Sequence, residues 1–128
     1  MLCNEIYASS LRILGESVND GENEDYEERA PYLIASFCAS AKAMDRAWRL
    51  SFALERQGNW NCVCIPLTNE FPLSDRFVSA ASFYLAAMLV IDSDESLYEK
   101  LYGLFCDEMS EISGEIPAVI ESISNKYF

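Results

Sequence analysis

The sequence predicts an all-α fold, and three observations lead to this prediction. Apolar residues recur three and four positions apart through most of the chain, which is the spacing of one helix face. Residues 77–91 carry no charged side chain. Residues 59–73 form the one long stretch without a regular pattern. We therefore expect a single helical domain over residues 1–128, with four to five helices packed around a central apolar helix at about residues 75–92 and one long irregular middle loop.

The first expected element is an amphipathic helix over residues 2–18. Gly15 weakens the end of this helix, and residues 19–24 contain the asparagine, aspartate and glycine that favour a polar loop. The apolar side chains of the helix fall near one face and are Leu2, Ile6, Ile13, Leu14 and Val18.

A long second helix is expected next. The acidic residues from Glu24 to Glu28 suit the positive end of a helix dipole. Pro31 is compatible with a first turn or a kink, so regular helix is expected to begin near Ala30. Gly58 is a suitable residue to terminate it. The apolar stripe of this helix is Ile34, Phe37, Cys38, Ala41, Met44, Trp48 and Phe52.

The middle loop is interrupted by Pro66 and Pro72, and its asparagines favour turns. Residues 62–65 could form a short extended piece. The loop also carries large apolar side chains, which either fold back onto the core or stay exposed as anchors for a partner. These side chains are Trp60, Ile65, Leu67, Phe71 and Leu73.

The central helix is expected to begin after Ser74, a suitable N-cap, with Asp75 in its first turn. A helix that is apolar on all sides must be surrounded by other elements. Its apolar run of 15 residues is shorter than the roughly 20 that cross a bilayer. Arg76 and Asp92 also flank it closely, so we expect a buried helix and no membrane span.

The acidic residues 92–95 are expected to end the central helix and to start another, although Ser96 and Glu99 form an alternative capping box. The stripe of this helix is Leu97, Leu101, Leu104, Phe105 and Ile112. Ser113-Gly114 is expected to break the chain before a last apolar stripe, made of Ile116, Val119, Ile120 and Ile123.

The chain is strongly acidic, with a formal net charge of -12. Because 51% of the residues are hydrophobic, this charge is not a sign of disorder. A surface so negative repels phosphate groups, so specific nucleic-acid binding and binding to anionic membranes are not expected. Better solubility is the simplest consequence of the charge.

Several catalytic and metal-binding arrangements are missing from the sequence. The chain has no histidine, which excludes Ser-His and Cys-His nucleophile pairs. Cys62 and Cys64 lack a second pair at zinc-site spacing, and the acids after Ile91 lack the glycine of a calcium loop. No acid was found inside an apolar stripe, so no raised pKa is expected. We predict no catalytic residue, metal or cofactor, with a carboxylate enzyme as the open alternative.

The five cysteines are an odd number, and three of them lie in apolar surroundings. The first residues show neither a basic start nor a long apolar core of the kind found in signal peptides. We therefore expect reduced, buried thiols in a cytoplasmic protein.

Charge is unevenly distributed along the chain. Four of the nine basic residues gather on the C-terminal half of the expected second helix, between acidic segments on either side: Lys42, Arg46, Arg49 and Arg56. Either they form salt bridges inside the fold, or they form a surface for a partner or for a second copy in a ring. The residues predicted to contact a partner are Trp60, Ile65, Leu67, Phe71, Arg46 and Arg49.

The order of these pieces resembles the small helical head–tail connector proteins of tailed phages and prophages, also called adaptor or head-completion proteins. The resemblance covers residues 25–128 loosely and is best at the central helix. It rests on Glu24-Asp25-Tyr26-x-Glu28-Arg29-Ala30-Pro31, on Leu73-Ser74-Asp75 after the loop that contains Leu67, on Leu85-Ala86-Ala87-Met88-Leu89, on the acids and the aromatic helix that follow, and on Ile123 and Tyr127.

This resemblance implies a non-enzymatic part of a virion that forms a ring under the portal and bridges it to the tail. Its partners would be portal, tail or neck proteins, or further copies of itself. An acidic lining would suit a conduit through which DNA must slide without adhering. The alternative is a cytoplasmic acidic helical module that binds or regulates another protein.

Overall fold

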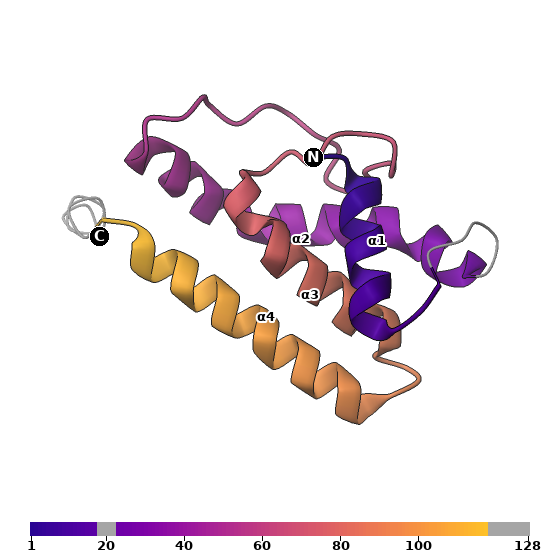
Figure 1. The fold of residues 1–128 in the computed structure, drawn as a ribbon. Helices are drawn as coiled ribbons and strands as arrows, with labels where there is room; N and C mark the ends of the chain where they lie inside the picture. Colours follow the sequence, from indigo (N-terminus) through magenta and orange to yellow (C-terminus); the bar gives the residue numbers. More distant parts are fainter. Residues whose placement is uncertain (18–22, 118–128) are drawn as a thin grey trace.

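The computed structural model describes residues 1–17 and 23–117. Within these residues no strand is present, and only an isolated bridge joins Leu2 to Glu70. The predicted all-α class is therefore confirmed. The helices are α1 (Cys3–Leu14), α2 (Glu24–Ser51), α3 (Val78–Val90) and α4 (Glu95–Glu115), with the short 3₁₀ helix η1 (Asp75–Phe77) leading into α3 (Figure 1).

Helix α3 is the predicted apolar helix, and it contacts α1, α2 and α4. Figure 1 shows it running beside α4, with α1 and α2 on its other side. The alanines Ala80, Ala81, Ala86 and Ala87 are all buried, and their small side chains allow the neighbouring helices to approach closely. No helix in the described part of the chain is both long and apolar enough to cross a membrane.

The core is organised around Phe37 of α2, whose side chain is 1% exposed. Its ring lies 6.3 Å from Phe71 of the middle loop, 5.7 Å from Tyr84 of α3 and 6.0 Å from Phe105 of α4, measured between centroids. Offset and edge-on ring pairs at these distances are favourable beyond the area that they bury. Phe37 therefore joins the middle loop and two helices to α2.

Helix α1 is attached to the middle loop through its first turn. The backbone N–H groups of Cys3 and Asn4 donate to the carbonyls of Asn69 and Leu67, both at 2.9 Å. The first N–H groups of a helix have no partner within it, so the loop satisfies donors that would otherwise be buried or bound to water. At the other end Gly15 adopts φ 74°, a left-handed conformation that suits glycine.

The bounds of α2 differ from the expectation at both ends. The helix begins at Glu24 and passes through Pro31, although it was expected to begin near Ala30. The Pro31 carbonyl accepts a hydrogen bond from Ile65 N–H at 3.1 Å, so the loop packs against this turn. The helix ends at Ser51, and Gly58 does not terminate it.

The end of α2 is closed by a residue other than glycine. Ala53 adopts φ 53°, and Leu54 N–H donates to the Arg49 carbonyl at 2.8 Å. This is the hydrogen bond of a Schellman motif, in which the left-handed position is usually glycine. Sequence reasoning selected Gly58 because the alanine that occupies this position gives no signal.

Replacing Ala53 by glycine is expected to stabilise the protein by about 1 kcal/mol. An alanine in the left-handed region experiences a steric clash that glycine avoids, and this gain exceeds the extra flexibility of glycine in the unfolded chain. Urea unfolding followed by circular dichroism measures the effect. Gly58→Ala is the reverse substitution at a site with open space and no positive φ, where alanine is expected to be the more stable residue by about 0.4–1 kcal/mol. Destabilisation by Ala53→Gly would contradict the assigned conformation.

Other expectations changed in detail. Helix α4 continues through Ser113 and Gly114 to Glu115, so the expected break there is wrong by two residues. The side chain of Asp94 accepts a hydrogen bond from Leu97 N–H at 3.0 Å, which selects Asp94 as the N-cap. Residues 62–65 form no strand. The loop residues 19–22, together with Val18, Val119, Ile120, Ile123 and Tyr127, lie outside the described residues.

The five cysteines fall into three environments. Cys3 and Cys38 are fully buried, Cys64 is half-buried, and Cys62 and Cys106 are exposed. Burial raises the pKa of the Cys3 thiol to about 11 and also raises the pKa of Cys38. The expectation of buried thiols is therefore correct for two cysteines only.

Thiol alkylation of the native protein is expected to label Cys62 and Cys106 quickly and Cys64 more slowly. Cys3 and Cys38 should remain unmodified until denaturant is added, because the reactive thiolate is both inaccessible and disfavoured there. Mass spectrometry of peptides after timed labelling measures this order. Early labelling of Cys38 in the native protein would contradict the packing of α2.

Candidate partner-binding surface

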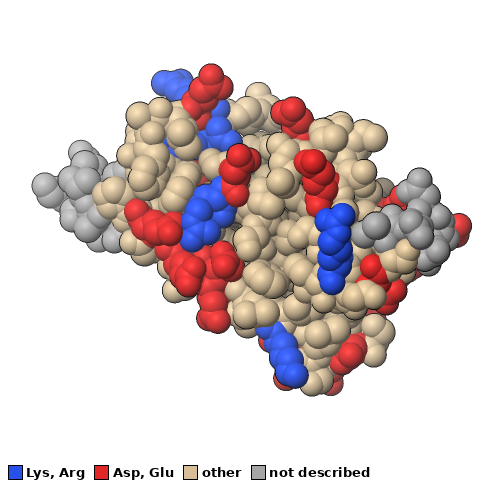
Figure 2. All heavy atoms as spheres, in the orientation of Figure 1, with Lys and Arg blue, Asp and Glu red and all other residues tan. Residues whose placement is uncertain are grey.

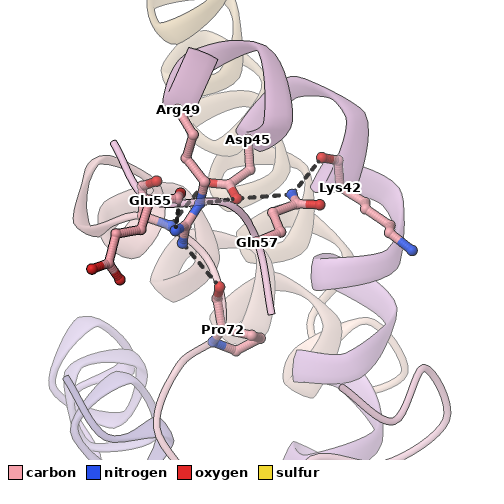
Figure 3. A network of polar contacts seen from close by, with 7 residues as sticks. Lys42, Asp45, Arg49, Glu55, Gln57 and Pro72 are labelled. Carbon is pink, nitrogen blue, oxygen red and sulfur yellow. Dashed lines mark hydrogen bonds and ion pairs between the residues drawn. The ribbon is translucent and has the colours of Figure 1, made fainter. Parts of the chain in front are cut away.

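The C-terminal half of α2 carries a fully buried carboxylate, Asp45. Three groups donate to it, each at 2.8 Å: Ser74 backbone N–H binds Oδ1, and Arg49 Nε and Gln57 Nε2 bind Oδ2 (Figure 3). A buried charge is tolerated only when it is paired and hydrogen-bonded in this way.

Arg49 connects the Asp45 carboxylate to two backbone carbonyls, one in the chain that leaves α2 and one in the chain that enters η1. Its Nη1 donates to the Glu55 carbonyl at 3.0 Å and its Nη2 to the Pro72 carbonyl at 3.1 Å. Gln57 Nε2 also donates to the Lys42 carbonyl at 2.7 Å. This network fixes the chain that leaves α2 and the chain that enters η1 against the same two turns of helix (Figure 3).

The pKa of Asp45 reflects two opposing effects. Desolvation by burial raises it, but the hydrogen bonds from Ser74, Gln57 and Arg49 outweigh burial and lower the pKa below its usual value of 3.8. Asp45 is therefore ionised at neutral pH and its oxygens are occupied by donors. Its role is to hold Arg49 and Gln57 in place.

The expectation that no acid lies in an apolar stripe is wrong for Asp45. The spacing Cys38, Ala41, Asp45, Trp48 follows the three-four-three pattern of the buried face. The helical spacing therefore already indicates that Asp45 faces the core. This was missed because Asp45 stands between Met44 and Arg46 in a segment rich in charge. Only the direction of the pKa shift requires the structure.

A cavity of about 430 Å³ lies beside this network. It is lined by basic residues, two leucines and amide groups, and no acidic residue lines it: Lys42, Arg46, Arg49, Leu50, Leu54, Arg56, Gln57, Gly58 and Asn59. Arg49 is engaged with Asp45, and the Lys42 ammonium lies 5.3 Å from the centre of the Trp60 ring. Among the described residues, Arg46 and Arg56 form neither an ion pair nor a side-chain hydrogen bond.

Large apolar side chains are exposed at the same end of α2. Leu50 is 73% exposed, Phe52 46% and Leu54 49%. They lie within five residues of one another in the sequence, and Leu50 and Leu54 line the cavity together with Arg46 and Arg56. We call these five residues the α2-end surface.

The structure separates the predicted partner residues into three groups. Ile65 and Phe71 are 3% and 7% exposed, so they fold back onto the core and are not available as surface anchors, which corrects the expectation for both. Trp60 and Leu67 are half-buried against that core. Arg49 is held by Asp45, and Arg46 alone remains fully exposed.

Sequence reasoning missed Leu50 and Leu54 and placed Phe52 in the buried stripe. The stripe does continue to Trp48, whose ring lies 4.4 Å from that of Phe52. Leu50 lies inside α2, four residues after the exposed Arg46, so helical spacing alone places it on the exposed face. Phe52 and Leu54 follow the last residue of α2, Ser51, and the expected helix to Gly58 gave them a different register.

Internal salt bridges account for the other clustered charges. Arg76 Nε lies 2.8 Å from Glu115, Nη1 lies 3.4 Å from Glu108 and Nη2 lies 3.9 Å from Glu111. Hydrogen bonding to Arg76 lowers the pKa of Glu115. Figure 2 shows acidic and basic side chains set next to one another on this face, with wide uncharged areas between them. Of the four basic residues for which salt bridging was one of two alternatives, Arg49 forms an ion pair with Asp45 of the same helix. Lys42, Arg46 and Arg56 form none within the described residues.

Within residues 1–17 and 23–117, no group of three or more cysteine, aspartate or glutamate side chains is arranged to hold a metal ion. Comparison of the chain with family models, with curated proteins and with solved structures found no match. The α2-end surface and its cavity are therefore assigned from geometry alone.

Proposed function

We propose that this chain is a non-enzymatic structural protein that acts by binding other proteins, and that it is a head–tail connector subunit of a prophage, bridging portal and tail. The observation that carries the protein-binding role is the α2-end surface, where Leu50, Phe52 and Leu54 are exposed and two of them, Leu50 and Leu54, line one cavity with Arg46 and Arg56. The connector assignment rests on the resemblance of the chain to that class of protein.

The composition of the surface supports a protein partner. Aromatic residues and arginine are enriched at the centres of protein interfaces, and apolar side chains there exclude water from the charged contacts. Leu50 and Leu54 also line the same cavity, whereas single exposed apolar residues need no explanation. The remaining negative surface would keep the free subunit soluble until it meets its partner.

Gene neighbourhood tests the connector assignment most directly. Flanking genes that encode portal, capsid or tail proteins are expected. Co-expression with the neighbouring portal and tail proteins, followed by affinity purification, should then recover a complex. Flanking genes without any relation to phage assembly would end this assignment.

A charged substitution tests the surface itself. Leu50→Asp combined with Leu54→Asp is expected to abolish co-purification, because two carboxylates would replace the apolar contacts. Val63→Asp is the control, since Val63 is 70% exposed and lies outside the surface. Equal recovery with both proteins would show that the partner binds elsewhere.

The alternative function is a cytoplasmic acidic module that binds or regulates another protein. The same surface favours it, because a basic and apolar patch does not require an assembly of phage proteins. A gene outside any prophage, with a stable complex that depends on Leu50 and Leu54, would favour this module over the connector.

A further inference from the structure

We infer that the cavity at the end of α2 receives an acidic segment of a protein partner, whose carboxylates bind Arg46 and Arg56 and whose apolar side chain packs on Leu50 and Leu54. This inference rests on the proposed protein-binding function and adds the chemistry of the partner. It starts from two arginines that line one cavity without an ion pair in the described structure.

Arg12, Lys42 and Lys100 also lack an ion pair in the described structure, and of these five cations Lys42, Arg46 and Arg56 line one cavity. The chain has 21 acidic and nine basic residues, and Arg29, Arg49 and Arg76 each find a carboxylate. Arg46 and Arg56 lie in the one stretch, residues 42–59, where the acids are already committed or directed away. Their charge is therefore available to a ligand.

The two acids in that stretch do not neutralise the cavity. Asp45 is buried and its charge is balanced by Arg49 at 2.8 Å. Glu55 contributes its carbonyl to the network, while its carboxylate points away from Arg49 (Figure 3). The local potential at the cavity is consequently positive, although the chain as a whole carries -12.

The helix dipole explains only part of this arrangement. Cations near the C-terminus of a helix are stabilised by its partial negative charge, but the effect fades beyond the last turn. Arg49 lies in that turn of α2. Lys42 lies well before it, and Arg56 lies beyond the helix, so the dipole does not account for the gathering of these charges.

The apolar wall decides between kinds of anion. Leu50 and Leu54 line the cavity together with the arginines. A bare phosphate or a nucleic-acid backbone would leave them exposed, and the negative surface elsewhere would repel a long polyanion. A peptide that carries both carboxylates and a leucine-like side chain satisfies both parts, and a cavity of about 430 Å³ has the size of typical ligand pockets.

The walls of the cavity are fixed before binding. Gln57 and Arg49 are held through Asp45, and the Schellman hydrogen bond from Leu54 to Arg49 at 2.8 Å fixes the turn after α2. A partner would therefore have little backbone to order there, which favours affinity.

The test uses the full chain and a fluorescein-labelled peptide of glutamates with leucines spaced along one helix face, at physiological ionic strength. Fluorescence anisotropy is expected to show binding that is weakened about tenfold or more by Arg46→Glu with Arg56→Glu, because attraction becomes repulsion at two positions. Amide shifts in NMR spectra should be concentrated in residues 42–59.

A matched control separates the cavity from overall charge. Arg12→Glu with Lys100→Glu lowers the net charge by the same amount, and both residues are exposed cations without an ion pair in the described structure. This protein is expected to bind the peptide within about twofold of the wild type. Equal loss in both double variants would overturn the inference.

Two further probes define the ligand. A glutamate peptide without leucine is expected to bind more weakly, and inorganic phosphate and a single-stranded oligonucleotide should not displace the peptide. Equal binding of the leucine-free peptide, or tighter binding of the oligonucleotide, would overturn the inference. If no acidic peptide binds while Leu50→Asp with Leu54→Asp still disrupts a complex, the partner chemistry is wrong and the proposed function stands.

Discussion

Replacing Phe37 by alanine is expected to lower the free energy of unfolding by about 3–5 kcal/mol. The ring is 1% exposed and contacts Phe71, Tyr84 and Phe105. Its removal leaves a cavity at the point where the middle loop, α3 and α4 meet α2. The surrounding rings belong to different elements, so they cannot all move inward to fill it.

Urea unfolding followed by far-UV circular dichroism measures this loss, provided that the transition is two-state. Phe37→Leu keeps most of the volume and is expected to cost less than about 1.5 kcal/mol. Tyr32→Ala is the control on the same helix, since Tyr32 is 56% exposed, and should change stability little. A loss from Phe37→Ala no larger than that from Tyr32→Ala would contradict the aromatic core.

The sequence was sufficient to predict the all-α class because apolar spacing reports burial directly. The run from 77 to 91 indicated a buried helix, and α3 is that helix, preceded by η1. Helix bounds were less accessible. Pro31 and Gly58 gave strong local signals, yet α2 begins at Glu24, well before Pro31, and ends at a turn closed by a left-handed Ala53.

The candidate surface could be predicted only in part. The clustering of Arg46, Arg49 and Arg56 is visible in the sequence, whereas the engagement of Arg49 with Asp45 depends on folding. Apolar anchors were expected within residues 60–71, but the large exposed apolar side chains near the basic cluster lie within residues 50–54. A loop residue such as Phe71 is buried because α2 and α3 offer it an aromatic neighbour, and no local pattern encodes that neighbour.

Replacing Asp45 by asparagine is expected to destabilise the protein by about 3–5 kcal/mol at neutral pH. The carboxylate accepts from Ser74, Arg49 and Gln57, and an asparagine offers only one acceptor oxygen in its place. If that oxygen keeps the bond to Ser74, the amide nitrogen of the asparagine faces the donors of Arg49 and Gln57. Because the amide nitrogen is itself a donor, neither hydrogen bond can form. The Arg49 guanidinium then remains half-buried without its counter-charge.

Two further variants distinguish the stability lost by breaking the buried Asp45–Arg49 pair from the stability lost by removing any one negative charge. Asp107→Asn removes an exposed acid of α4 and is expected to change stability by less than about 0.5 kcal/mol. Asp45→Leu combined with Arg49→Met replaces both partners by apolar groups and should recover part of the loss, because no isolated buried charge is left. The stability losses of Asp45→Leu alone and Arg49→Met alone are measured beside that of the double variant. A loss in the double variant equal to the sum of the two single losses would contradict the pairing of Asp45 with Arg49.

The pH dependence of the same variant supplies an independent check. The pKa of Asp45 is lower in the folded protein than its usual value of 3.8. Its contribution is therefore complete at and above about pH 5 and is lost as the pH falls through the folded pKa, where the native state must take up the proton. The difference in unfolding free energy between wild type and Asp45→Asn is thus expected to stay constant from neutral pH to about pH 5 and to shrink below about pH 4.

Other carboxylates with a lowered pKa, such as Glu115, titrate in both proteins and cancel in the difference. A difference that does not change with acidification would mean that the pKa of Asp45 is the same in the folded and the unfolded protein, and the hydrogen bonds from Ser74, Gln57 and Arg49 would then not favour its ionised form.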